Sequence, residues 1–287
     1  MFPSLPKVTI RQATSQDIAS ITRFMDQAVL VHRNLDWQPL MDWVTREPFL
    51  LRFEGQKLTS LFSCAADPPG TAWIHAFAMD HWSSDMEKTW HSLLEPSLAI
   101  LQQEKSSLFT VALHEWYKIL LNATSFSIFQ KIVVLNWNQS LPKTLPTPGN
   151  LIIRPMTQTD LDAVVSVDRQ TFDPVWTISR ASMECAFFSA AHASVAEMDD
   201  TIIGYELSTA SHLSAHLTRL AVHPDYKHAN IGYSLTRLML EYFQQLHINL
   251  VTVNTQQDNS ASIGLYKKLG FSLTEESFPI YWREIAC

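Results

Sequence analysis

The stretch HPDYKHANIGYS, residues 223–234, has the composition of an anion-binding turn between a strand and a helix. The preceding residues 216–222 form a short apolar run that predicts a strand. The following residues predict a helix over 232–246, because apolar side chains recur there at helical spacing. These side chains are Leu235, Leu238, Met239 and Tyr242. A turn of this kind directs several unpaired backbone N–H groups at one point, and such a point binds phosphate.

Length and composition indicate a globular protein with two domains of ordinary size. The chain has 287 residues and is 46% hydrophobic, and no apolar run approaches the roughly 20 residues that a membrane helix needs. We therefore expect a cytoplasmic protein without a membrane partner. The cysteines are far apart and lack metal-ligand spacing, so we expect reduced thiols and no bound metal. They are Cys64, Cys185 and Cys287.

Charge differs between the two halves of the chain. Residues 1–147 carry 12 basic and 13 acidic side chains, whereas residues 148–287 carry 9 basic and 15 acidic ones. The acidic second half argues against a nucleic-acid partner and favours a cationic substrate near that half. Solubility alone is the other interpretation of the same excess.

A proline-rich segment divides the chain. The sequence LPKTLPTPGN, residues 141–150, contains three prolines and shows no apolar periodicity. This composition is typical of a semi-extended connector. It predicts a first domain over 1–140 and a second over 151–287.

The two domains are predicted to be copies of one another. Three pairs of similar segments stand at nearly the same offset of 142 or 143 residues, which is unlikely by chance and implies a duplication. The pairs are IRQATSQD (10–17) with IRPMTQTD (153–160), HAFAMDHW (75–82) with TRLAVHPD (218–225), and LFTV (108–111) with LVTV (250–253).

The second copy predicts a mixed α/β sheet with helices covering its faces. The strands are expected at 151–155, 193–198, 201–210, 216–222, 248–254 and 271–283, and the helices at 160–169, 180–188, 232–246 and 260–269.

Two motifs of the second half resemble the GNAT superfamily of acyl-CoA-dependent N-acyltransferases. LAVHPDYKHANIGYSL (220–235) is similar to the family's strand, pyrophosphate loop and helix, and NSASIGLYKKLGF (259–271) is similar to its Asn-to-Tyr-to-Gly-Phe segment. The resemblance covers nearly all of 151–287 and, more faintly, 8–137. It implies two tandem GNAT-like domains, each a mostly antiparallel twisted sheet with helices on both faces.

The loop departs from the family pattern, which is Arg or Gln, two residues, Gly, one residue, Gly. Asn230 stands at the first glycine position, and asparagine tolerates a left-handed backbone better than other side chains do. Lys227 keeps a positive charge without the bidentate fork of arginine. The resemblance implies that the amides of 228–233 cradle the pyrophosphate of acetyl-CoA. The loop residues predicted to bind it are Lys227, His228, Ala229, Asn230, Ile231, Gly232 and Tyr233.

The resemblance implies transfer of an acetyl group from acetyl-CoA to a primary amine of a small molecule, a peptide or a protein. Backbone N–H groups near Leu220 and Val222 would donate to the thioester carbonyl and to the pantetheine arm, respectively, and Ala221 between them is also expected to contact acetyl-CoA. Tyr266, seven residues after Asn259, matches the family tyrosine that protonates the CoA thiolate. A core aromatic is the other interpretation of Tyr266.

The general base is harder to assign. Many relatives have a Glu five residues before the motif asparagine, but this chain has Asn254, which cannot accept a proton. Other relatives place the base six residues before the position of Val222, which here is His216. With an ordinary pKa of about 6.5, His216 can accept a proton directly or through water. A hydrogen-bonded strand histidine is its other interpretation, and Glu206 is a weaker candidate base.

Acceptor recognition is implied to lie in the loop 171–179 and the last hairpin, 275–284. Aromatic and acidic side chains there can bind an ammonium group, although a core needs aromatics as well. The segment TFDPVW also faintly resembles the loop of ribosomal-protein alanine acetyltransferases, an assignment that Asn254 puts in doubt. The predicted pocket consists of Phe172, Asp173, Trp176, Glu206 and Tyr281.

The first domain is predicted to lack acetyl-CoA binding. At the 143-residue offset, the loop falls on residues 84–89, which include no glycine, and the carboxylates of Asp85 and Glu87 would repel a pyrophosphate. Domain one would then serve as scaffold, substrate wall or partner surface. A non-catalytic acyl-CoA sensor and an interaction protein with two degenerate copies remain alternatives, and a homodimer is compatible with the sequence.

Overall fold

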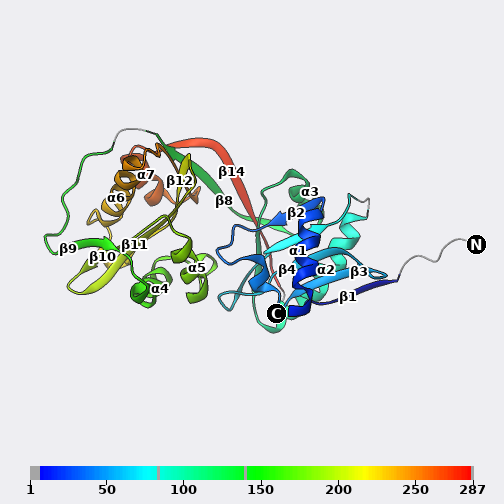
Figure 1. Ribbon diagram of the computed structural model, residues 1–287. Helices are drawn as coiled ribbons and strands as arrows, with labels where there is room; N and C mark the ends of the chain where they lie inside the picture. Colours follow the sequence, from blue (N-terminus) through cyan, green and yellow to red (C-terminus); the bar gives the residue numbers. More distant parts are fainter. Residues whose placement is uncertain (1–6, 83–84, 139–140, 286–287) are drawn as a thin grey trace, which may run out of the picture. The chain divides into compact units, whose positions relative to one another are not determined.

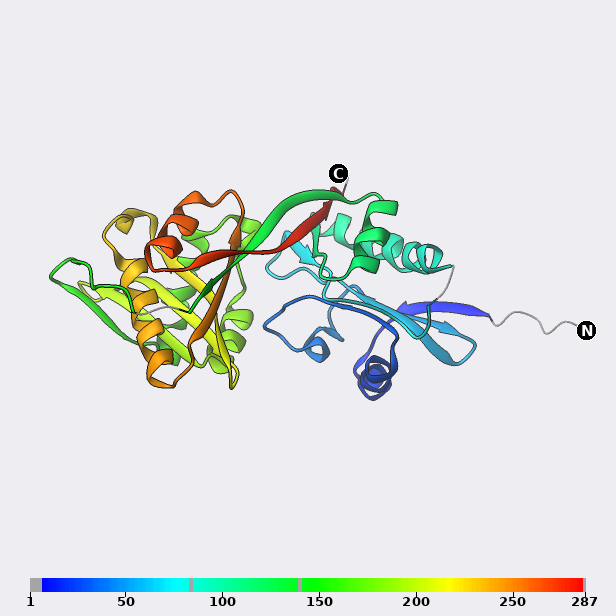
Figure 2. The ribbon, with the colours of Figure 1, turned by 90° about the horizontal axis from the view of Figure 1, so that it is seen from above.

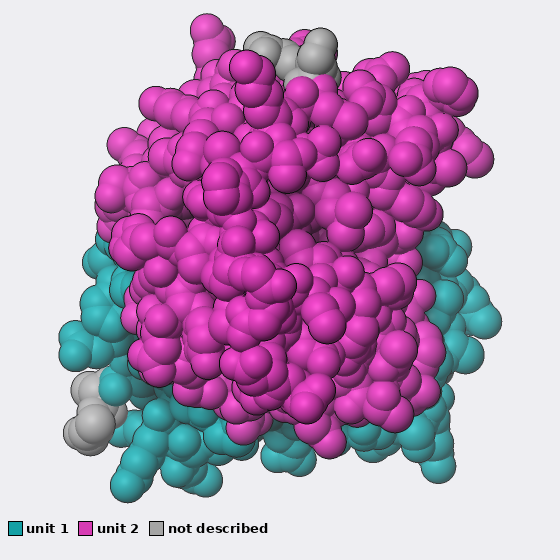
Figure 3. Space-filling view, turned by 90° about the vertical axis from the view of Figure 1, so that its left-hand side faces the viewer, with its two compact units in different colours: residues 1–129, 279–287 teal, residues 130–278 magenta. Residues whose placement is uncertain are grey.

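The computed structural model describes residues 7–82, 85–138 and 141–285 (Figure 1). The chain forms two compact units, which are coloured separately in Figure 3. Unit 1 comprises Met1–Phe129 together with Pro279–Cys287, and unit 2 comprises Gln130–Phe278. Among the described residues, no helix has both the length and the apolar character needed to cross a membrane.

These units differ in their bounds from the domains predicted on either side of the proline-rich segment. Strand β8 (Ser127–Trp137) is hydrogen-bonded to β13 (Leu250–Gln256), which lies in unit 2. The end of β14 (Ser272–Arg283) is hydrogen-bonded to β7 (Ser107–Val111), which lies in unit 1. The composition of the connector does not show which strands pair with one another. Only the hydrogen bonds of the sheets show that β8 pairs within unit 2 and that the end of β14 pairs within unit 1.

Unit 2 confirms the predicted mixed α/β sheet. Its strands lie in the order β14-β8-β13-β12-β11-β10-β9. Strands β12 and β13 are parallel, and the other pairs from β8 to β9 are antiparallel. The strands not yet given are β9 (Leu151–Pro155), β10 (His192–Met198), β11 (Thr201–Ala210) and β12 (Ser214–Val222).

Helices cover both faces of the unit 2 sheet (Figures 1 and 2). One face carries α4 (Leu161–Thr171) and α5 (Arg180–Ser189), and the other carries α6 (Ile231–Gln245) and α7 (Ser260–Lys268). The helix predicted after the loop is confirmed, and Leu235 and Met239 of its apolar spacing are fully buried. Leu238 and Tyr242, which the same spacing placed on the apolar face, are instead exposed.

Unit 1 has a related but shorter set of elements. One sheet has the order β1-β3-β4-β6-β2, and β5, β7 and the end of β14 pair separately. Its strands are β1 (Val8–Gln12), β2 (Leu30–Arg33), β3 (Phe49–Glu54), β4 (Lys57–Ser63), β5 (Thr71–Trp73) and β6 (Ala76–Met79). Its helices are α1 (Ile18–Gln27), α2 (Met86–Gln103) and α3 (Glu115–Ala123).

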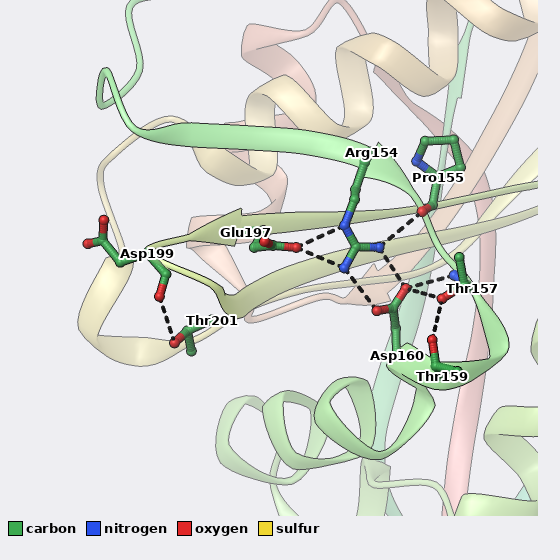
Figure 4. A network of polar contacts seen from close by, with 8 residues as sticks. All are labelled: Arg154, Pro155, Thr157, Thr159, Asp160, Glu197, Asp199 and Thr201. Atoms are coloured by element: carbon green, nitrogen blue, oxygen red, sulfur yellow. Dashed lines mark hydrogen bonds and ion pairs between the residues drawn. The ribbon is translucent and has the colours of Figure 1, made fainter.

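The first pair of repeated segments folds into the same polar clamp in both units. In unit 2, the Arg154 guanidinium donates to both carboxylate oxygens of Asp160 at 2.8 and 2.9 Å, and Asp160 also accepts from the backbone and side chain of Thr157 (Figure 4). Arg154, together with these bonds from Thr157, lowers the pKa of Asp160 to about 2. In unit 1, Arg11 and Asp17 form the equivalent pair at 2.8 and 2.6 Å. The duplication is therefore visible in side-chain geometry as well as in sequence.

Candidate active site

The unit 2 sheet opens at the strand that leads into the predicted loop. Strand β12 pairs with β13 only from Ser214 opposite Leu250 to Leu217 opposite Val253. Beyond these residues β12 continues to Val222 beside β11, while β13 continues beside β8. Two parallel strands that separate in this way leave a wedge between their carboxyl-terminal halves.

Backbone N–H groups of β12 point into this wedge. The N–H of His223 donates to the carbonyl of Ile203 beside β11, at 2.8 Å. Because N–H groups alternate between the two edges of an extended strand, those of Leu220 and Val222 point to the opposite edge, from which β13 has departed. The N–H of Ala221 instead faces β11. Two of the three strand residues singled out from the sequence therefore offer donors to a ligand.

The loop and the start of α6 lie at the open end of the wedge. Asn230 is the N-cap of α6 and is left-handed, with φ of 57° and ψ of 17°, which confirms the backbone expected at this glycine-like position. His228 is also left-handed, with φ of 66°, which the sequence pattern does not indicate. Lys227 and His228 are exposed. A helix N-terminus with an exposed cation beside it favours an anion.

Three elements converge at Gly232. A methyl group placed on Gly232 would lie 3.5 Å from the side chains of Leu265 and Val222 and 3.8 Å from that of Leu220. The first turn of α6, the end of β12 and helix α7 therefore meet at one place. This meeting point brings together the two motifs that are about 25 residues apart in the sequence.

A β-bulge in β12 determines which side chains face which helices. Leu207 of β11 lies opposite Arg219, and Ser208 lies opposite Leu217, so Thr218 is the extra residue on β12. Leu217 packs in the core below α6, whereas Arg219 bonds to Asp168 of α4. His216, next to Leu217, therefore lies on the α4 side of the sheet together with Arg219.

His216 is held by a neighbour on β13. Its Nδ1 lies 2.7 Å from the hydroxyl oxygen of Thr252, and burial lowers the pKa of the imidazole below its ordinary value. When Nδ1–H donates to that hydroxyl, the lone pair of Nε2 is free to accept a proton. In that tautomer, the neutral imidazole could serve as a general base.

Tyr266 lies in the unit 2 core and is 5% exposed. Its ring packs against Phe271 with centroids 5.6 Å apart, and burial raises the pKa of its phenol. Within the described residues, its hydroxyl has no hydrogen-bond partner. The phenol is therefore protonated and available to donate.

A buried cluster that the sequence analysis did not identify anchors the predicted acceptor loop. Asp168 accepts from the Tyr205 hydroxyl and from Arg219 Nε, the latter at 2.5 Å. Arg219 Nη2 donates to the carbonyl of Trp176 at 2.6 Å, and its guanidinium lies 4.2 Å from the centroid of the Phe172 ring. The signal in the sequence was a single arginine inside the apolar strand 216–222.

Of the pocket residues predicted from the sequence, Phe172, Asp173 and Trp176 share this anchored loop, and Glu206 does not join them. Glu206 lies on the opposite, α6 face of the sheet, opposite Leu220. It is fully buried, bonded to His192 Nδ1 at 2.6 Å and to Ser208. Burial raises the pKa of Glu206, against the opposing effect of His192. Side-chain alternation along β11 excludes it from the pocket, because its neighbour Tyr205 takes the α4 face.

Tyr281 also lies elsewhere, and this is a second correction to the predicted pocket. Tyr281 belongs to the part of β14 that pairs with β7, and its side chain is buried in the core of unit 1. Its hydroxyl donates to Asn122 Oδ1 at 2.9 Å. Tyr281 is therefore a structural core residue of unit 1.

Asn259 has a local role at the start of α7. Its side-chain oxygen accepts from the N–H of Ser262 at 3.0 Å, which caps the helix that carries Tyr266. The structure thus gives Asn259 a direct effect on the orientation of α7.

In unit 1 the equivalent wedge is filled by a strand. There β5 pairs in parallel with β7, and the chain then continues as β6. Strands β5 and β6 correspond to the first and second halves of β12 in unit 2. Strand β2 pairs with β6, with Leu30 opposite Met79. Its buried His32 lies 3.2 Å from the Thr110 hydroxyl on β7. Of the loop positions expected in unit 1, residue 84 lies outside the described part of the chain, and Asp85 is the N-cap of α2.

Comparisons with known proteins agree with this geometry. Residues 161–271 match the model of the Acetyltransferase (GNAT) family. A putative ribosomal protein bS18-alanine N-acetyltransferase of Bacillus subtilis is 27% identical over 118 residues, which are 41% of this chain and 78% of that protein. An uncharacterized N-acetyltransferase of Methanocaldococcus jannaschii is 26% identical over 124 residues, 42% of this chain and 78% of that one.

Two solved structures share the fold along almost the whole chain. A tandem GNAT protein from the clavulanic acid biosynthesis pathway has a TM-score of 0.66 at 12% identity and covers 98% of this chain and 99% of its own. A GCN5-related N-acetyltransferase from Sphaerobacter thermophilus has a TM-score of 0.62 at 13% identity, with 99% and 98% covered. Residues 161–271 are thus similar to the GNAT family of acetyltransferases, and the two units have the fold of a tandem GNAT protein.

Proposed function

We propose that unit 2 binds acetyl-CoA in the wedge between β12 and β13 and transfers its acetyl group to a primary amine. The observation that carries the proposal is the separation of these strands after Leu217 and Val253, which frees the N–H groups of Leu220 and Val222. The loop 227–232 at the open end supplies an exposed lysine and the N-terminus of α6 for the pyrophosphate.

The proposed chemistry needs two proton transfers and one stabilised oxyanion. The amine nitrogen attacks the thioester carbon, and the N–H of Leu220 donates to the oxygen that becomes negative. A proton leaves the amine nitrogen for Nε2 of His216, directly or through a water molecule. The carbon–sulfur bond then breaks, and the Tyr266 hydroxyl donates its proton to the departing thiolate. The products are an N-acetyl amide and free CoA.

The acceptor we propose is an amine presented to the loop 172–178. Phe172 and Trp176 lie on this loop beside Arg219, with the carboxylate of Asp173 at its start. The named activity of the Bacillus subtilis relative suggests an N-terminal alanine as one acceptor to test. Asn254 stands where many relatives have a glutamate, and this difference weakens the likeness to the alanine acetyltransferases. Small-molecule amines are therefore equally important acceptors to test.

A panel assay of free CoA release tests the function. Purified full-length protein and acetyl-CoA are mixed with polyamines, amino sugars, amino acids and peptides with N-terminal alanine, and thiol release is followed. We expect at least one amine to raise the release rate well above hydrolysis. Acetyl-CoA binding without turnover on any amine would instead favour the sensor function.

A first prediction concerns stoichiometry. Because β2 fills the wedge of unit 1, we expect calorimetry to give one acetyl-CoA site per chain. Gly232→Glu places a carboxylate in the first turn of α6, where β12 and α7 meet at the proposed site, and should abolish the heat of binding. Gly264→Glu on α7 is the matched control, since a side chain there meets open space. Two equivalent sites, or residual binding in Gly232→Glu, would contradict the prediction.

A further inference from the structure

The segment 141–146, here called the strap, lies along the first turns of α6. Three side chains of the loop and helix donate to its backbone carbonyls. Asn230 Nδ2 donates to Pro146 at 2.9 Å, the Tyr233 hydroxyl to Lys143 at 2.7 Å, and Arg237 Nε to Pro142 at 2.9 Å. Residues 230, 233 and 237 lie on one stripe of a helix, because their spacing is three and four residues.

Apolar and ionic contacts hold the strap and its donors in place. Leu141 and Leu145 of the strap pack against the core cluster of unit 2. The Tyr233 ring is buried, with the Lys268 ammonium 5.4 Å from its centroid. Arg237 is further held by Glu241 at 3.1 Å. The strap is therefore anchored by two leucines and by three hydrogen bonds.

One of these bonds reaches the residue on which the shape of the loop depends. A side chain in the left-handed region is strained relative to glycine, and it persists only when its surroundings fix it. Asn230 is left-handed, and its amide group is fixed by the carbonyl of Pro146. Where the family pattern has a glycine with free choice of φ, this chain has an asparagine tied to the strap.

We infer that the strap is a positioning element of the acetyl-CoA loop, with Asn230, Tyr233 and Arg237 as the positioning residues. The inference rests on the proposed binding of acetyl-CoA to this loop. Strap docking selects the loop conformation whose amides face the ligand, so the docked strap and bound acetyl-CoA stabilise one another. Such coupling is reciprocal: loosening the strap weakens acetyl-CoA binding, and acetyl-CoA holds the strap down.

Trypsin cleavage after Lys143 reports strap docking, because this lysine is exposed and lies in the middle of the strap. Full-length protein is digested with and without saturating acetyl-CoA, and the Lys143–Thr144 cut is followed by mass spectrometry. Cleavage after Lys105 in unit 1 serves as the internal control. Acetyl-CoA affinity is measured in parallel by calorimetry.

The test variants are Tyr233→Phe and Arg237→Met, which remove strap bonds but leave residues 227–232 and the backbone N–H of residue 233 in place. Each should speed the cut after Lys143 and weaken acetyl-CoA binding by about three- to tenfold, the effect of one net hydrogen bond. Tyr242→Phe removes a hydroxyl from the same helix away from the strap and should behave as wild type. In the wild type, acetyl-CoA should slow the cut after Lys143 and leave Lys105 unaffected.

Two results would overturn the inference alone. One is acetyl-CoA binding to the wild type without protection of Lys143. The other is a faster cut in Tyr233→Phe and Arg237→Met with acetyl-CoA affinity equal to that of the wild type. A wild-type protein that gives no heat with acetyl-CoA would overturn the proposed function and this inference together.

Discussion

Tyr266→Phe should lower the maximal rate of acetyl transfer by roughly 10²-fold or more, with little change in acetyl-CoA affinity. The substitution removes only the hydroxyl. The ring stays in the unit 2 core against Phe271, so the fold and the orientation of α7 are retained. Without the phenol, the thiolate must leave as an anion or take its proton from water, and the barrier to carbon–sulfur cleavage rises.

Burial favours this role for Tyr266. It raises the pKa of the phenol, so the group is protonated across the whole working range of pH. Since its hydroxyl has no partner within the described residues, donation to a thiolate breaks no existing bond. A structural tyrosine would behave differently, because losing an unbonded hydroxyl from a core costs little.

The measurement is the rate of CoA release at saturating substrates, with affinity from calorimetry. Tyr242→Phe on α6 is the control for removing a phenol hydroxyl from unit 2. A rate within twofold of wild type in Tyr266→Phe would show that the tyrosine only packs, and the proton would have to come from solvent.

His216→Ala should lower the rate and remove the acidic limb of the pH profile. A base must be neutral to accept a proton, so activity rises as pH increases through the pKa of His216. Burial lowers that pKa, so the limb should lie below about pH 6.5, the ordinary value for an imidazole. An amine acceptor with a pKa of about 10 would by itself place a limb much higher.

A second substitution separates proton transfer from packing. His216→Gln can keep a hydrogen bond to the Thr252 hydroxyl but does not titrate, and it should lose the limb as fully as His216→Ala. His212→Ala is the control, because His212 is exposed just before β12. This variant should keep the acidic limb. An unchanged acidic limb in both His216 variants would assign the titration to the substrate and return His216 to a structural role.

The order of elements was determined by local sequence. Apolar periodicity, the turn residues and the repeated segments predicted the mixed sheet and the position of each helix of the second copy, and the structure confirms them. The left-handed conformation of Asn230 was also predictable, because it follows from the properties of one residue type at one turn. These features depend on interactions between residues near one another in the chain.

Tertiary structure alone decided which strands share a unit. Tyr281 was expected in the acceptor pocket, but its part of β14 pairs with β7 and buries it in unit 1. Strand β2 fills the wedge of unit 1 by pairing with β6, which no periodicity in the sequence indicates. Pairing between distant strands depends on the free energy of the whole sheet, and the hydrophobic pattern of a single segment does not show it.

The bulge at Thr218 shows the same limit within one strand. Strict alternation of β12 would have placed Leu217 and Arg219 on one face, yet the extra residue sends Leu217 below α6 and Arg219 to Asp168 of α4. The sequence by itself therefore determined the loop, the helices and the types of side chain that are available for catalysis. The faces on which His216, Glu206 and Arg219 lie were decided by strand register, because one inserted residue reverses every side chain beyond it.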